Sequence, residues 1–101
     1  MTYKVAYNAC YGGYGLSDLA IGRLKDYGFS FEYDFDFNYI PRHDPTLIRV
    51  IEELGEEASD KFADIQIRII SGSYYRVSDY DGRETVVTPD SMEWINIEAE
   101  K

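Results

Sequence analysis

The 101-residue sequence has a single cysteine, a single histidine and only three prolines. One cysteine cannot build an internal disulfide framework, so a reducing intracellular setting is the easier interpretation. No apolar run reaches the roughly 18 residues that a membrane-spanning helix needs, and the N-terminus lacks the basic stretch and apolar core of a signal peptide. The sequence therefore predicts a cytoplasmic protein without a membrane partner.

Positive charge is also scarce. Ten Lys and Arg residues stand against nineteen Asp and Glu residues, which gives a net charge of −9. Proteins that bind nucleic acid directly need a cationic surface, so we expect no nucleic-acid partner. A basic protein partner is compatible with this charge. Hydrophobic residues make up 45% of the chain and aromatic residues 16%, enough for a globular core in a chain of one-domain length.

The N-terminal third predicts a strand, a glycine-rich loop and a helix. Residues 2–8 alternate in hydrophobicity as a strand does, and residues 9–16 contain three glycines. Ser17 is placed to cap a helix that Gly28 ends. The expected strand face is Tyr3, Val5 and Tyr7, and the apolar stripe of the helix is Ala20, Ile21, Leu24 and Tyr27.

Residues 29–39 alternate strictly between aromatic and polar side chains. A period of two predicts a strand with one buried and one solvated face. The aromatic set is Phe29, Phe31, Tyr33, Phe35, Phe37 and Tyr39, and the polar set is Ser30, Glu32, Asp34, Asp36 and Asn38. Because a long exposed aromatic stripe promotes association, we expect at least two of the four rings from Phe31 to Phe37 to pack under the helices or in a dimer seam.

The C-terminal half predicts a second helix, a strand and a hairpin. Asp44 and Pro45 begin the helix as N-cap and first helical residue, and Gly55 ends it. Asp81-Gly82 is a strong two-residue hairpin turn, because both positions need positive φ. Residues 56–63 are either a helical turn or a loop, and residues 64–70 are predicted to form a strand with Ile65, Ile67 and Ile69 inward. The hairpin strands are at 74–80 and 83–88. The tail at 90–101 is weakly determined, and part of it is expected to dock onto the core through Met92, Trp94, Ile95 and Ile97.

These elements give the order β-α-β-α-β-β-β and a single α+β domain over residues 1–101. We expect a mixed sheet of about five strands with both helices packed on one face, which leaves the other face more polar. If the first strand and the strand at 64–70 are neighbours, a right-handed crossover makes that pair parallel.

The glycine-rich loop is the strongest candidate site. Backbone N–H groups between a strand and a helix N-terminus suit an anion or a partner contact, although three glycines also suit a tight turn. Neither the P-loop pattern nor the dinucleotide fingerprint is present, so we expect no cofactor. The candidate ligand- or partner-binding residues are Asn8, Cys10, Tyr11, Gly12, Gly13, Tyr14, Gly15 and Ser17. Tyr11 and Tyr14 lie in a turn, where burial is least assured.

Cys10 and His43 are weaker candidates for thiol catalysis. A helix N-terminus lowers the pKa of a thiol, but a nucleophile also needs a base, and His43 is the only histidine. A cysteine at a strand end is more often a small buried hydrophobe, so the catalytic set is predicted to be empty.

Glu32, Asp34 and Asp36 form an acidic strand face that is either simply solvated or able to meet a basic protein groove, as a nucleic-acid mimic does. Carboxylates two residues apart on a strand are about 7 Å apart, which is loose for a shared cation, so no metal site is predicted. Arginines scattered through the chain interrupt any continuous anionic track; they are Arg23, Arg42, Arg49, Arg68, Arg76 and Arg83.

The segment from Asn8 to Ser17 reads Asn-Ala-Cys-Tyr-Gly-Gly-Tyr-Gly-Leu-Ser. It resembles a group of small uncharacterised proteins of bacteriophages and large DNA viruses, which carry Asn-x-Cys-Tyr-Gly-Gly-Phe-Gly/Ser-Leu-Ser after a short strand. Similar stretches follow in the same order at 42–45, 50–55 and 80–82, so the resemblance covers residues 3 to about 88. Departures are Tyr14 for the usual Phe, the long aromatic–acidic segment at 29–39 and the tail beyond Trp94. The resemblance implies a viral accessory protein that acts in the host cytoplasm.

Two functions from different classes follow. The first is a small acidic, non-catalytic viral accessory protein that binds and blocks or sequesters a host protein, with an anti-defence role as one form. The alternative is a small ligand-binding or enzymatic domain that uses the loop from Gly12 to Gly15 for an anionic, phosphate-bearing molecule. A homodimer is compatible with either.

Overall fold

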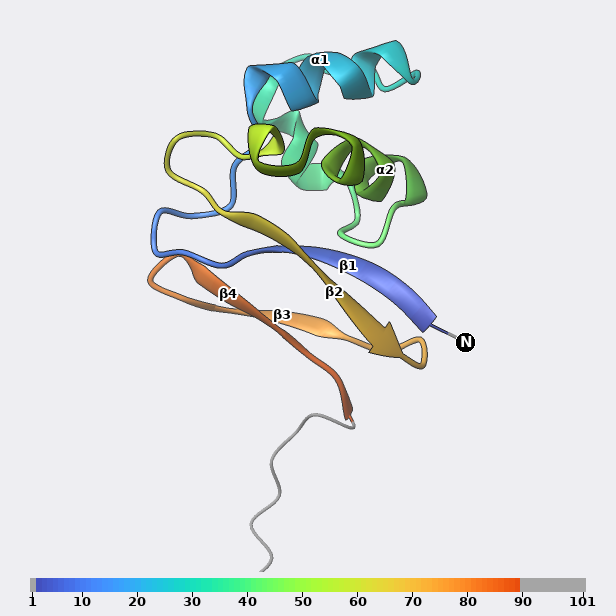
Figure 1. Cartoon of the computed structure of the whole chain (residues 1–101), viewed down its shortest axis with the longest axis vertical. Coiled ribbons are helices and arrows are strands. Elements are labelled where there is room, and N and C mark those ends of the chain that lie inside the picture. The colour runs from blue at the N-terminus through green and yellow to red at the C-terminus, as the bar shows by residue number, and fades with distance from the viewer. Residues whose placement is uncertain (1, 90–101) are drawn as a thin grey trace, which may run out of the picture.

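The computed structural model describes residues 2–89 and stacks a helical layer, a two-stranded sheet and a β-hairpin (Figure 1). The tail predicted to dock onto the core lies outside the described residues. The elements in chain order are β1 (Thr2–Asn8), α1 (Asp18–Asp26), the 3-10 helix η1 (Asp34–Tyr39), α2 (Pro45–Leu54), the 3-10 helix η2 (Gly55–Ala58), β2 (Ile65–Ser71), β3 (Arg76–Tyr80) and β4 (Arg83–Val87). The α+β class and the two helices are as predicted.

The strands form two separate two-stranded sheets, β1 with β2 and β3 with β4, instead of the expected five-stranded mixed sheet. The parallel pairing expected for β1 and β2 is wrong, because Asn8 lies opposite Ile65 and Thr2 opposite Ser71 in an antiparallel register. The chain returns from the helices to the end at which β1 finishes, and the Ala9 N–H donates to the Asp64 carbonyl there, at 2.8 Å. An antiparallel pair is the consequence of that return point.

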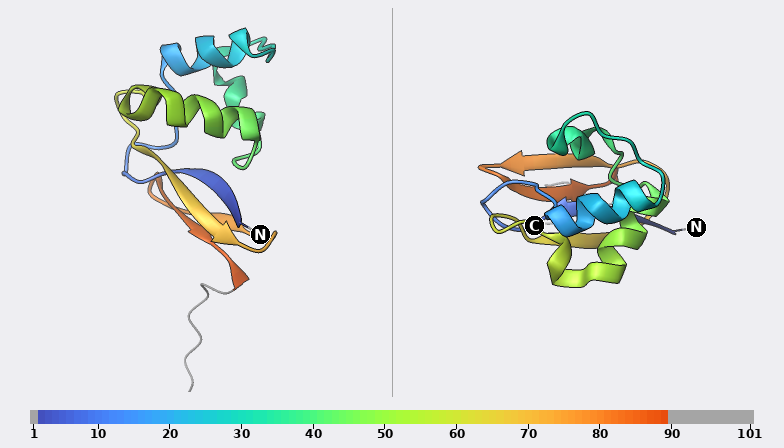
Figure 2. Two further views of the ribbon diagram at one scale, coloured as in Figure 1. Left: turned by 45° about the vertical axis from the view of Figure 1, so that its right-hand side comes forward. Right: turned by 90° about the horizontal axis from the view of Figure 1, so that it is seen from above.

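Both faces of the β1–β2 sheet have neighbouring elements, and the face away from the main core is partly polar, since Gln66 and Arg68 on it are exposed. One face lies under the helical layer, and the other lies against the hairpin (Figure 2). Val5, Ile70 and Val86 form a small core of their own between the sheet and the hairpin. Each sheet is too small to be stable alone, so this second apolar contact is needed to hold the hairpin.

Ile69 does not point into the core as predicted, because its side chain is 63% exposed. Ile65 and Ile67 on the same face do contact the main core. Ile69 pairs with Lys4, and at that end the helical layer supplies an exposed ion pair between Lys4 and Glu52, at 2.7 Å, in place of apolar cover.

The strand predicted for residues 29–39 is wrong: the chain bends and then forms η1. The Asp36 carboxylate accepts the backbone N–H groups of Glu32 and Tyr33, both at 3.0 Å. Such local side-chain to backbone bonds compete with strand pairing and turn the chain. The packing expectation for the aromatic rings is confirmed, because Phe37 is in the main core and Phe31 packs against it.

The helix ends are as predicted. Ser17 Oγ accepts the Ala20 N–H at 3.1 Å, and Asp44 Oδ1 accepts the N–H groups of Thr46 and Leu47 at 2.9 and 3.0 Å. The hairpin turn is also confirmed, since Asp81 has φ of 53° and Gly82 has φ of 90°. Capping contacts of this kind stabilise a helix by about 1 kcal/mol each and fix where α1 and α2 begin.

Candidate functional site

Asn8, at the end of β1, joins the loop, the start of β2 and the hairpin. Its side-chain amide donates to the carbonyls of Cys10 and Gly82, both at 2.7 Å. Its Oδ1 accepts the Asp64 N–H at 2.8 Å. Asn8 is 0% exposed, so every one of these bonds is shielded from water. The predicted site residue Asn8 thus serves the chain's own backbone, as a buried amide must.

The glycines of the loop make room for neighbouring segments of the same chain. A Cβ on Gly12 would overlap the Phe62 carbonyl oxygen, and a Cβ on Gly15 would overlap the Asp60 carboxylate. The hairpin turn also approaches the loop, because a Cβ on Gly82 would lie 2.5 Å from the Tyr11 carbonyl oxygen. The loop, the segment before β2 and the β3–β4 turn therefore meet backbone to backbone, which only glycine permits.

The two tyrosines of the loop have different surroundings. Tyr11 is exposed, with the Arg83 guanidinium 5.7 Å from its ring centroid. Tyr14 is mostly buried despite its place in a turn: its ring centroid lies 5.8 Å from that of Phe37 and 3.5 Å from the Arg42 guanidinium. Only Tyr11 of this pair is available to a partner.

Arg42 and Glu84 form an ion pair that joins the helical layer to the hairpin. The two terminal guanidinium nitrogens of Arg42 donate to the two Glu84 carboxylate oxygens at 2.6 and 2.9 Å, a bidentate geometry. Glu84 Oε1 also accepts the backbone N–H of Asn8 at 2.9 Å, and Glu84 is only 6% exposed. We call Asn8, Arg42 and Glu84 the polar cluster. The cluster is not evident from the sequence, because its members lie on three distant segments.

Burial raises the pKa of Tyr14 from 10 to about 12, while the nearby Arg42 charge opposes the rise. The Tyr14 hydroxyl is buried and has no hydrogen-bond partner among residues 2–89. Removing an unsatisfied hydroxyl is inexpensive, so Tyr14→Phe should leave the free energy of unfolding at neutral pH unchanged or slightly higher.

The free energy of unfolding of the wild type and that of Tyr14→Phe should depend differently on pH above pH 10. The unfolded chain loses the Tyr14 proton near pH 10 and the folded chain near pH 12, so the folded state binds more protons in that window. Stability therefore falls as pH rises from 10 to 12, by roughly 2–3 kcal/mol for this group. Urea unfolding of Tyr14→Phe should lack that part of the alkaline loss; identical pH profiles would contradict the assignment.

Cys10 and His43 have separate partners. The Cys10 thiol has two possible hydrogen-bond acceptors, Asn8 Oδ1 at 3.4 Å and the Phe62 carbonyl at 3.1 Å. His43 Nδ1 lies 2.7 Å from the Tyr75 hydroxyl. No hydrogen bond joins Cys10 to His43 in the described part of the chain, so the arrangement that a thiol nucleophile and its base require is not formed there.

Residues 2–89 hold no group of three His, Cys, Asp or Glu side chains arranged to bind a metal ion. Within the same range, no helix is long and apolar enough to cross a membrane.

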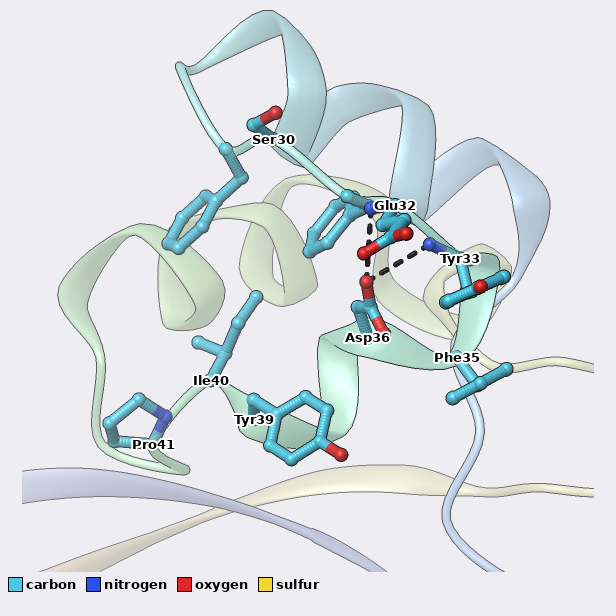
Figure 3. A pocket seen from close by; sticks show the side chains of 10 residues that line it. Ser30, Glu32, Tyr33, Phe35, Asp36, Tyr39, Ile40 and Pro41 are labelled. Atoms are coloured by element: carbon cyan, nitrogen blue, oxygen red, sulfur yellow. Dashed lines mark hydrogen bonds between the residues drawn. The ribbon is translucent and has the colours of Figure 1, made fainter.

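A surface pocket of about 590 Å³ lies between the end of α1 and the start of α2 (Figure 3). Three aromatic side chains on its wall are well exposed: Tyr33 at 56%, Phe35 at 59% and Tyr39 at 82%. The rings of Tyr33 and Phe35 stack with centroids 5.4 Å apart and planes 5° apart. We call Tyr33, Phe35 and Tyr39 the aromatic surface. Clustered exposed rings of this kind are typical of protein–protein contact sites.

The backbone that carries the aromatic surface is held in place from within. Phe37 and Ile40 are buried in the main core, and Asp36 closes the turn before η1, as the dashed lines in Figure 3 show. Asn38 Nδ2 adds a bond to the Phe35 carbonyl at 2.9 Å. The alternation of these rings is typical of a strand face, but Asp36 stands three residues after Tyr33, which is the spacing of a capping contact and indicates a turn.

No protein-family model, no curated protein and no solved structure matches this chain.

Proposed function

We propose that this protein is a non-catalytic accessory protein that binds another protein through the aromatic surface. The observation that carries the proposal is that three large rings are exposed on a turn whose inward residues, Phe37 and Ile40, are in the core. A preformed aromatic contact loses little conformational entropy on binding, which favours affinity.

The surroundings of the loop residues favour binding over catalysis. Close approaches within the chain explain Gly12, Gly15 and Gly82. The Cys10 thiol lies within hydrogen-bond distance of Asn8 and Phe62. No comparable observation favours a phosphate-bearing ligand at the loop.

The resemblance of the segment from Asn8 to Ser17 to viral proteins supports a more specific form of the proposal. In that form, the partner is a host component that the protein blocks or sequesters in the host cytoplasm, with an anti-defence role as one case. The acidic net charge of −9 suits a basic partner.

Affinity capture from host lysate tests the proposal with matched baits. The wild-type protein should retain one stoichiometric partner, and the double variant Phe35→Ala/Tyr39→Ala should lose it. Removing exposed rings has little effect on stability but removes the anchors of an interface. Tyr80→Ala is the control, since Tyr80 is 77% exposed on the hairpin. Retention of the same partner by the double variant would refute this surface as the contact site.

A further inference from the structure

We propose that the partner segment bound by the aromatic surface is cationic and presents arginine. This inference rests on the proposed function and specifies the chemistry of the partner.

The segment that forms the pocket carries negative charge and no positive charge. Residues 29–41 contain Glu32, Asp34 and Asp36 and not one Lys or Arg. Glu32 is exposed on the pocket wall beside the rings. A purely apolar partner would remove water from that carboxylate without replacing its hydrogen bonds, which costs free energy. A cationic partner supplies both the charge and the donors.

The fold itself twice combines an arginine with an aromatic face and a carboxylate. Arg42 lies over the Tyr14 ring at 3.5 Å and pairs with Glu84. On the helices, Arg49 lies 4.6 Å from the centroid of Tyr27 and pairs with Glu53 at 2.8 Å. The guanidinium group suits both neighbours at once, because it stacks on rings and donates to carboxylates in its plane.

The aromatic surface also combines aromatic rings with a carboxylate, but it has no guanidinium group between them. Exposed rings and the Glu32 carboxylate line one pocket, yet among residues 2–89 no cation lies over Tyr33, Phe35 or Tyr39. An incoming arginine side chain would complete the arrangement seen at Tyr14 and Tyr27. Lysine satisfies the charge but not the planar stacking, so we expect arginine to bind more tightly.

The test is a titration of the full chain, followed by NMR, with a short capped peptide of arginines separated by glycine and leucine. The matched peptide replaces each arginine with citrulline, which keeps the shape and removes the charge. The arginine peptide should shift backbone resonances mainly within residues 29–41, and the citrulline peptide should bind roughly tenfold or more weakly. Added salt should weaken only the arginine peptide.

Variants locate the contact. Phe35→Ala/Tyr39→Ala and Glu32→Gln should each weaken the arginine peptide, the first by roughly tenfold or more, whereas Tyr80→Ala should not. Equal binding of the two peptides, or shifts centred away from residues 29–41, would overturn the inference. So would a dimer in sedimentation experiments that Phe35→Ala/Tyr39→Ala dissociates, because the occupant would then be a second copy of the chain.

Failure of this inference is separable from failure of the proposed function. A captured partner that depends on Phe35 and Tyr39, together with no preference for the arginine peptide, would keep the binding role and reject the cationic partner.

Discussion

Glu84→Ala is expected to lower the free energy of unfolding by about 3 kcal/mol, because it leaves the partly buried Arg42 guanidinium without its counter-charge. The same change removes the acceptor of the Asn8 backbone N–H, which has no access to water. Urea denaturation with a common m-value measures the loss.

Thr85→Ala is the matched control for Glu84→Ala, since Thr85 is the next residue of β4 and is exposed. It should change stability by no more than about 0.5 kcal/mol. The double variant Arg42→Met/Glu84→Leu should be less destabilised than Glu84→Ala, because no unpaired charge remains. A loss below about 1 kcal/mol for Glu84→Ala would show that the polar cluster does not hold the hairpin.

Gly12→Ala should be the most damaging single methyl addition in the loop. The new Cβ would overlap the Phe62 carbonyl, which is backbone and cannot rotate away as a side chain does. Overpacking against fixed backbone costs about 3 kcal/mol, and the segment before β2 would have to move. Thermal or urea unfolding against the wild type measures the effect.

Alanine substitutions at two other glycines serve as comparisons for Gly12→Ala. Gly13→Ala meets no atom within 4 Å, but φ at Gly13 is +90°, so we expect a loss of about 1 kcal/mol from backbone strain alone. Gly22→Ala lies in α1 with open space around it and should stabilise the protein by about 0.5–1 kcal/mol. If Gly12→Ala is no worse than Gly13→Ala, then the close approach to Phe62 is not limiting.

The helices were predictable because their determinants are local. Ser17 and Asp44 cap within three residues of themselves, and Gly28, with φ of 110°, ends α1 in the conformation that glycine favours. The Asp81-Gly82 turn is local in the same sense. Contacts between residues so close in sequence can be recognised from the residue types at neighbouring positions.

The segment at 29–39 was not predictable from periodicity, since alternation describes side chains and not the pairing that a strand requires. The Asp36 carboxylate accepts the backbone N–H groups of residues four and three positions earlier, which turns the chain, and Phe37 is buried in the core. The pattern correctly predicted that some rings are buried. It did not predict that Tyr33, Phe35 and Tyr39 are presented outward from a turn.

The loop at residues 8–17 was recognisable in the sequence, but the reason for its residues was not. Asn8 contacts Asp64 and Gly82, and Gly12 lies against Phe62, so their partners come from distant parts of the chain. Likewise, Arg42 and Glu84 looked like ordinary surface charges, because their pairing depends on how β4 packs against β1.

The polar cluster also determines when the protein can finish folding during its synthesis. Glu84 is synthesised 76 residues after Asn8 and 42 residues after Arg42, yet it bonds to both. Until β4 is made, the Asn8 backbone N–H and the Arg42 guanidinium lack the Glu84 carboxylate that accepts from both. Loops of this length close slowly, so the rate-limiting step in folding is expected to be the arrival of the hairpin, and ribosome-bound chains that stop short of Glu84 should remain sensitive to proteases.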